Sequence, residues 1–271
     1  MSETVAARTW DGRGAAQSAL QLSAIAWFIP ALIGNWFFAY HVAETYFLAA
    51  LGGDYSGWTD RLFVGLVEGD AVGNTALAVH LIVAFTVSLA GPLQFIPQIR
   101  AYAPAFHRWN GRIYIFTGIL TSLAALYMIW TRDTFGPDTL EIPVSLNGVL
   151  ILVFAAITLR YAMARNIDVH QRWALRTFFV MSGVWFLRVM YAFLGAVTGG
   201  DIPGVDDVMG GPTNLALGYA SFLLPLAALE VYFLAKRSPS ATAKSAVAAL
   251  VFAAAVATAI GAYGTSMRWL S

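Results

Sequence analysis

Long apolar runs alternate with short polar segments along most of the chain. Seven runs are long enough to cross a hydrocarbon core of ~30 Å at ~1.5 Å of rise per helical residue. They cover residues 20–40, 75–99, 108–130, 144–162, 173–197, 214–235 and 246–263. The pattern therefore predicts an all-α protein, a polytopic transmembrane helix bundle of about seven spans.

Two features of the sequence predict details of the first half of this bundle. Pro92 and Pro97 should bend and end the second span, because each removes a backbone donor and crowds the preceding turn. The loop 41–73 is rich in Gly, Asp and aromatic residues, and we expect a short interfacial helix at 59–67 within it.

The composition supports a membrane protein. Hydrophobic residues make up 59% of the chain and charged residues 11%, against ~25% charged in a soluble domain. The mean hydropathy is +0.67. The chain has no cysteine, which excludes disulfides and thiolate metal sites. We expect the lipid bilayer as the main partner and no nucleic-acid partner.

The same pattern divides the chain into four parts. Residues 1–18 form a polar N-terminal tail, 19–236 a six-helix membrane core, 237–245 a linker, and 246–265 the seventh transmembrane helix. The first span is too long for the core of a signal peptide, so we expect it to be retained.

Loop charges predict the orientation. With a cytoplasmic N-terminus, twelve of the sixteen Lys and Arg residues fall in inner segments, as the positive-inside rule requires. The outer segments then hold only Arg61, Arg132 and Arg268, together with most of the carboxylates. This distribution predicts a multi-pass protein of a bacterial-type inner membrane.

The histidines are the main candidates for chemistry. His80 lies in the second span, where Ala76, Ala84 and Ser88 lie one or two turns away and make a small-residue face for helix packing. His80 should therefore face protein. His107 and His170 open two similar segments, FHRWNGRIYIF and VHQRWALRTFF, at the predicted inner edge. The positive-inside rule and the aromatic belt explain the Arg and Trp residues there, but neither explains a histidine.

These segments resemble a known family, the prokaryotic predicted membrane proteins catalogued as domain of unknown function 2306. The resemblance covers roughly residues 74–195. The matching positions are His80, Pro92, His107, Arg108, Gly111, Arg112, Tyr114, His170, Trp173, Arg176 and Arg188. Ala174 departs from the pattern, because a methionine would be expected there. The resemblance implies a multi-span membrane protein and no particular activity.

Arg188 stands inside the fifth predicted span. A central arginine costs ~2.5–3.5 kcal/mol on insertion scales and normally faces the bundle with a partner, such as a bound acid or Glu44. If that span is one continuous helix, His170 and Arg188 lie on one face, five turns apart. We expect Glu230, near the inner end of the sixth span, to pair with Lys236 or Arg237.

The first functional hypothesis is haem or metal binding for membrane electron transfer, with haem b as the cofactor. Imidazoles would ligate the iron and arginines would bind the propionates. We expect His41 to pair with His80 in the outer half, and His107 with His170 at the inner edge. The candidate cofactor-binding residues are His80, His107, His170, His41, Arg112, Arg176 and Arg188. A metal without haem would use His80, His107 and His170.

Two further hypotheses remain open. The first is that the bundle binds or transports a small anionic or amphipathic ligand, such as a quinone, lipid or organic acid, with Arg188 and His80 as the recognition pair. The second is that the protein is a noncatalytic assembly partner of other membrane proteins. The sequence contains no catalytic motif of the hydrolase, phosphate-loop or dinucleotide type, so it does not decide whether the protein is an enzyme.

Overall fold

The computed structural model describes residues 12–60, 62, 64–132, 140–205 and 211–270, and this part of the chain contains helices but no strand. Arg61 and residues 1–11 of the predicted tail lie outside it. Six of the described helices are individually long and apolar enough to span a membrane, and the count is seven if a bent pair of helices forms one span. The all-helical prediction is confirmed.

The six single spans are α1 (Gly12–Val42), α4 (Ala71–Leu93), α6 (Pro104–Arg132), α7 (Glu141–Met163), α10 (Gly211–Arg237) and α11 (Ala241–Leu270). The bent pair is α8 (Ile167–Met181) and α9 (Gly183–Thr198). Short connecting helices are η1 (Ala43–Leu48), α2 (Ala49–Leu51), α3 (Ser56–Asp60) and α5 (Pro97–Tyr102).

The element bounds agree with the sequence at the two prolines and differ from the predicted ranges at the loop helix and at the first and last helices. The α4 helix ends at Leu93 and α5 begins at Pro97, as the two prolines predict. The short loop helix is α3, which ends at Asp60, and the described residues 64–67 are not helical, so the range 59–67 was wrong. The first and last helices are longer than predicted, since α1 begins at Gly12 and α11 at Ala241.

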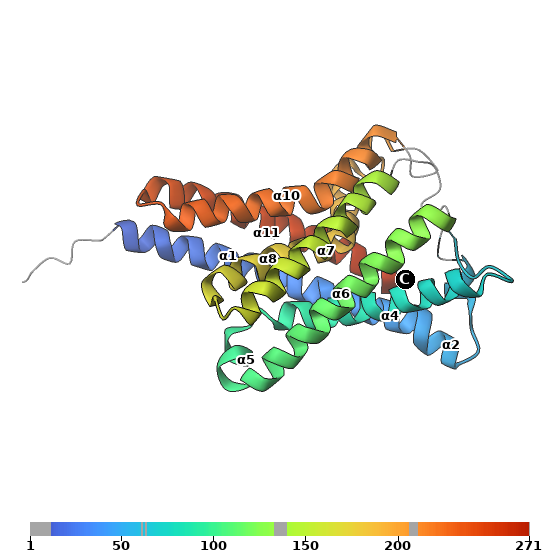
Figure 1. Cartoon of the computed structure of the whole chain (residues 1–271). Coiled ribbons are helices and arrows are strands. Elements are labelled where there is room, and N and C mark those ends of the chain that lie inside the picture. The colour runs from blue at the N-terminus through green and yellow to red at the C-terminus, as the bar shows by residue number, and fades with distance from the viewer. Residues whose placement is uncertain (1–11, 61, 63, 133–139, 206–210, 271) are drawn as a thin grey trace, which may run out of the picture.

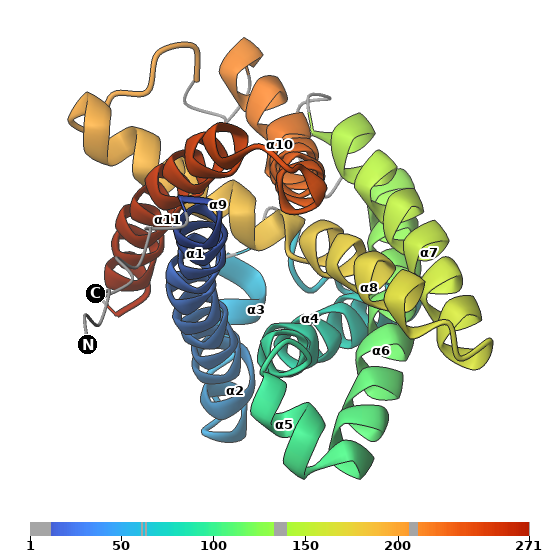
Figure 2. The same cartoon turned by 90° about the vertical axis from the view of Figure 1, so that its left-hand side faces the viewer.

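The spans form a closed bundle, which Figures 1 and 2 show from the side and along its length. The α1 helix packs between α11 and α4, then α4 packs on α6 and α6 on α7. The α9 and α10 helices complete the bundle on the far side of α11, and α8 packs on α7 and α10. The last helix is therefore an integral part of the bundle, in contact with α1 and α9.

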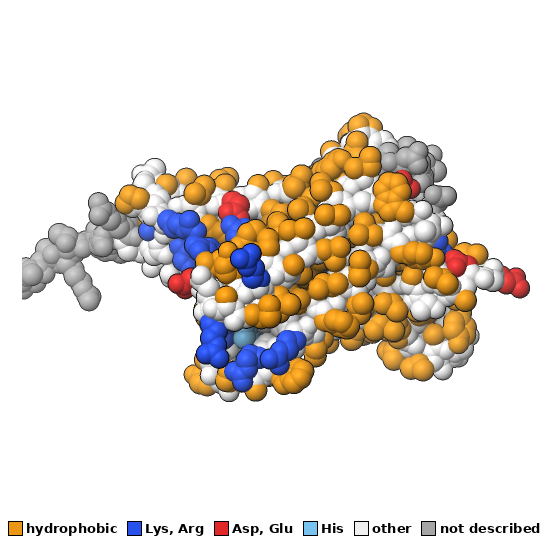
Figure 3. Space-filling model, viewed as in Figure 1, with side chains coloured by type: hydrophobic (Ala, Val, Ile, Leu, Met, Phe, Trp, Pro, Cys, Tyr) orange, Lys and Arg blue, Asp and Glu red, His pale blue; other side chains and the backbone are white. Residues whose placement is uncertain are grey.

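The surface has the charge distribution of a membrane protein. Apolar side chains such as Ile25, Phe116 and Leu224 are exposed along the middle of the bundle, where lipid would contact them. Lys and Arg gather at the end that carries α5 and the start of α6, as Figure 3 shows. We call this the basic end. Its assignment to the cytoplasm remains a prediction.

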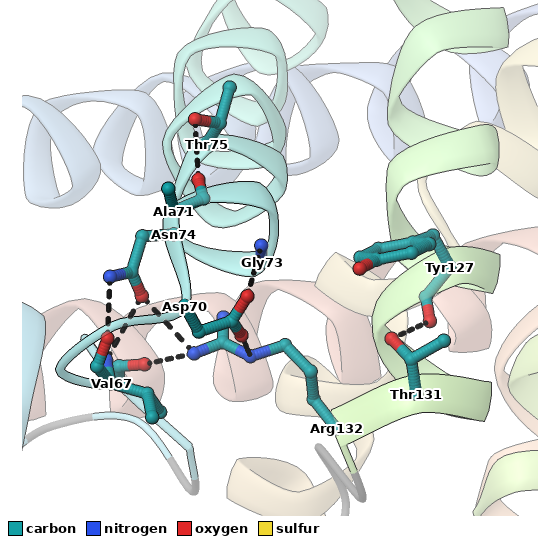
Figure 4. Close-up of polar contacts among 10 residues, drawn as sticks. Val67, Asp70, Ala71, Gly73, Asn74, Thr75, Tyr127, Thr131 and Arg132 are labelled. Atoms are coloured by element: carbon teal, nitrogen blue, oxygen red, sulfur yellow. Dashed lines mark hydrogen bonds and ion pairs between the residues drawn. The ribbon is translucent and has the colours of Figure 1, made fainter.

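An ion pair ties the loop before α4 to the end of α6 (Figure 4). Arg132 Nε lies 3.0 Å from Asp70 Oδ2, and its Nη2 donates to Gly65 O at 2.9 Å and to Asn74 Oδ1 at 3.2 Å. The other Asp70 oxygen caps α4 by accepting from the Gly73 N–H at 2.8 Å. Only 5% of the Arg132 side chain is exposed, so its charge depends on this pair.

We expect Asp70→Asn to lower the free energy of unfolding by about 2 kcal/mol, because it leaves a buried guanidinium without its counter-charge while keeping an oxygen for the cap. The value is below that of a fully buried pair because 32% of the Asp70 side chain is exposed. Thermal unfolding in detergent measures the loss. The exposed neighbour Glu68, changed to Gln, is the control, and equal midpoints for both variants would contradict the role of the pair.

Candidate functional site

The fifth predicted span is broken at its centre. The α8 and α9 helices meet at Ser182 with a bend of 56°, so the expectation of one continuous helix was wrong. A Ser-Gly pair, Ser182 and Gly183, stands at the break, and such pairs are common sites of helix kinks. Because of the bend, the expected common face for His170 and Arg188 does not follow from their spacing.

Asn147 of α7 stabilises this break. Its Nδ2 donates to Val180 O at 3.1 Å, in the last turn of α8, where the Ser182 N–H also donates to this carbonyl. Gly183 packs so closely on the same amide that an added Cβ would lie 2.7 Å from Asn147 Nδ2. The Asn147 side chain therefore fixes where α8 ends and α9 begins.

A cavity of about 240 Å³ lies between α9 and the end of α11. It is lined by Arg188, Tyr191, Ile202, Thr265, Arg268 and Trp269. Two arginines thus share one small space with an apolar wall. The two hydroxyl groups of the lining already donate within the protein, that of Tyr191 to Asn214 Oδ1 and that of Thr265 to Gly261 O. Planar guanidinium groups bind carboxylate and phosphate oxygens in pairs, so the lining suits an oxyanion.

Arg188 is an exposed residue of α9, and it lines the cavity. Its Nη1 donates to Val184 O at 3.1 Å, one turn earlier in α9, and its guanidinium carbon lies 5.1 Å from the centre of the Phe38 ring. Within the described residues, no carboxylate forms an ion pair with it, and Glu44 is exposed elsewhere. The cation is therefore held by weak contacts and faces an open space.

Small residues bring α9 and α11 together around this cavity. An added Cβ on Gly261 would collide with the backbone of Val189, so only glycine allows this approach. One turn later, the Thr265 hydroxyl donates to Gly261 O at 2.8 Å and lies 3.2 Å from Arg188 O. The last helix thus fixes the backbone of α9 at the position of Arg188.

His41 and His80, the two histidines expected in the outer half of the bundle, do not line this cavity but interact with residues that do. His41 stacks on Trp269 with ring centroids 4.9 Å apart, and its Nδ1 lies 3.1 Å from Thr45 Oγ1. His80 interacts with the backbone of Thr121 in α6, and the charge of Arg188 acts on its ring. Of the two residues expected to form a recognition pair, Arg188 lines the cavity and His80 does not.

At the basic end, His107 and His170 lie near enough to interact electrostatically. His170 Nδ1 lies 3.1 Å from Thr158 O. The two candidate arginines here already have partners. The Arg112 guanidinium carbon lies 4.9 Å from the centre of the Trp109 ring, and Arg176 forms a bidentate pair with Glu230 at 2.6 and 2.9 Å. The predicted pairing of Glu230 with Lys236 or Arg237 was wrong.

The described residues contain no group of three or more His, Cys, Asp or Glu side chains that could hold a metal ion. The set of His80, His107 and His170 therefore does not form one metal centre in this structure. Sequence reasoning missed Thr265, the last residue of the predicted seventh helix, and Arg268 and Trp269, which lie beyond its predicted end. The only signal was the proximity of an arginine and a tryptophan to the end of that apolar run.

We expect Asn147→Leu to lower the free energy of unfolding by about 1 kcal/mol, because it removes the hydrogen bond from α7 to Val180 O, which then keeps only the Ser182 N–H as a donor. The control is Asn35→Leu, since the Asn35 amide is equally buried but donates to Ala31 O within its own helix. That carbonyl keeps its helical bond in the variant, so the control should lose less. Thermal unfolding measures both. A larger loss for Asn35→Leu would show that Asn147 does not stabilise the break.

The comparisons with known proteins agree with the fold. The model of the family described as predicted membrane protein (DUF2306) matches residues 77–224, just over half of the chain. No curated protein and no solved structure gives a significant match. The matched region includes α6 to α9 and Arg188, whereas α1 and α11 lie outside it. The chain therefore belongs to the DUF2306 family of predicted membrane proteins.

Proposed function

We propose that this protein binds a small organic anion in the cavity between α9 and α11, with the acidic group of the ligand held by Arg188 and Arg268. The observation that supports this most strongly is the guanidinium of Arg188, which opens onto the cavity and forms no ion pair within the described residues. A cation inside a membrane bundle is costly unless an anion or water balances it. A bound ligand would supply that anion.

The dimensions of the cavity limit the ligand. At ~30 Å³ for each water molecule, about 240 Å³ corresponds to roughly eight waters. This volume accommodates an acidic head with a few carbon atoms, and a longer tail would extend outside. Ile202 and Trp269 supply apolar wall for such a tail. The two guanidinium groups favour a carboxylate or phosphate over a neutral quinone.

We expect wild-type protein in detergent to bind octanoate or octyl phosphate and not octanol, with Arg188→Met reducing the affinity by ~10–100-fold. This range corresponds to the loss of hydrogen bonds to a charged group. Isothermal titration measures each affinity. Arg112→Met, at the other end of the bundle, is the matched control and should bind as the wild type does. Absence of anion binding to the wild type, or equal binding by Arg188→Met, would contradict the proposal.

A second candidate function is haem-based electron transfer at the basic end. It is supported by His170, whose Nδ1 lies against a backbone carbonyl and leaves Nε2 free to ligate. This is the usual arrangement of a metal-binding histidine. The electrostatic proximity of His107 supplies a second imidazole, and Arg100 and Arg108 lie close to it. A haem would supply the redox chemistry, and these side chains would hold and orient it.

This second function predicts a Soret band, and α and β bands after dithionite reduction, in protein purified from cells that make haem. His170→Ala should lose these bands because it removes an axial ligand, whereas His41→Ala should keep them. Visible absorption spectra and metal analysis provide the test. A colourless and metal-free wild type would exclude the redox function and leave anion binding.

A further inference from the structure

Four buried polar atoms without a protein partner lie along α6 and its neighbour α4. They are Tyr114 OH, Ser122 Oγ and His107 Nδ1 on α6, and His80 Nδ1 on α4. In the described part of the chain, the only other such atom is Asn147 Oδ1, beside the break between α8 and α9. Tyr114 is 4% exposed and Ser122 is 2% exposed, so neither atom reaches the outer surface.

The geometry of α6 places these groups in a row. At 100° for each residue, positions 107, 114, 118 and 122 lie within about 80° of one another on one side of the helix. His107 and Ser122 are then ~22 Å apart along the helix axis, most of the thickness of a hydrocarbon core. His80 interacts with the backbone of Thr121, so it lies beside the row at the level of Ser122.

Burying these four atoms without hydrogen-bond partners costs free energy. A buried hydroxyl or imidazole nitrogen without a hydrogen bond costs ~1–3 kcal/mol, and in a membrane no lipid atom can replace the missing partner. Native proteins bury few such atoms, and those they bury usually bind internal water. A row of four in one interface therefore indicates a row of water molecules.

We propose that a file of internal water molecules follows the inward face of α6 and conducts protons between His80 and His107. In each step, a water, hydroxyl or imidazole accepts a proton from one neighbour and passes its own to the next. Nothing is oxidised, and the net event is the movement of one proton down its electrochemical gradient. Histidines suit the two ends because they exchange protons near neutral pH.

Charged groups stand near both ends of the row. Arg188 acts on His80 at one end, and Arg100, Arg108 and the ring of His170 act on His107 at the other. Because cations repel an excess proton, they set an electrostatic barrier at each end that limits the proton flux. The row does not depend on a ligand in the Arg188 cavity, and this inference is therefore separate from the proposed function.

A methionine closes the middle of the row. Met181 packs directly on Gly118, between Tyr114 and Ser122, and leaves no room there for a Cβ. It is the last residue of α8, next to the break. Its unbranched side chain can change rotamer without moving the backbone. The file of water would therefore be continuous past Gly118 only while the Met181 side chain adopts another rotamer.

The test uses the full chain in liposomes that contain a fluorescent pH indicator, with a potassium diffusion potential imposed by valinomycin. We expect proton uptake above that of empty liposomes. Met181→Ala should raise the rate several-fold because it opens the gap at Gly118, and Tyr114→Phe should lower it several-fold because it removes one link. Tyr127→Phe is the matched control, since Tyr127 lies on the same helix with an exposed ring.

Thermal unfolding of Tyr114→Phe gives a second and independent result. If the hydroxyl binds water, its removal leaves the midpoint unchanged or lower. If the hydroxyl is dry and unsatisfied, its removal raises the midpoint. We expect a higher proton flux for Met181→Ala, a lower proton flux for Tyr114→Phe, and no rise in the unfolding midpoint of Tyr114→Phe. Wild-type flux equal to that of empty liposomes, Met181→Ala or Tyr114→Phe flux equal to wild type, or a raised midpoint would each overturn it.

Discussion

Every polar group inside this bundle needs a partner from the protein, from water or from a ligand, because lipid offers none. The structure meets this constraint in several ways. Arg132 is satisfied by Asp70 and Arg176 by Glu230, both through ion pairs between different helices. Asn147 donates to a backbone carbonyl in the last turn before the break in the fifth span. Further hydrogen bonds join some of the same helices, such as Asn110 Nδ2 to Ala90 O between α6 and α4 and the Thr158–Thr177 hydroxyl pair between α7 and α8.

The groups without such partners are the informative ones. Arg188 faces a cavity, and the row from His107 to His80 offers donors and acceptors that no side chain meets. Both features lie next to the broken span, since α9 carries Arg188 and Met181 ends α8. The break therefore links an anion-sized cavity toward one end of the bundle with a row of unsatisfied atoms that leads to the other.

Much of the fold was predictable from the sequence, because hydropathy over a window of a span's length is a strong signal. The break at Ser182 was not, since the apolar run continues through it and one Ser-Gly pair is a weak signal. The expected pairing of His107 with His170 stays a prediction, although the two rings are close enough to interact electrostatically. The cavity joins Arg188 to Thr265, separated by 77 residues, and local patterns carry no information on such contacts. The pairing of Arg176 with Glu230 was missed for the same reason.

The central claim is that Arg188 is balanced by an anion from outside the chain. A crystal structure of the protein with a bromine-labelled carboxylate tests it most directly, because anomalous scattering locates the bromine. The account predicts bromine density at the cavity, with carboxylate oxygens ~2.7–2.9 Å from the Arg188 guanidinium. A carboxylate side chain of the protein itself in that position, with no bromine density nearby, would contradict it.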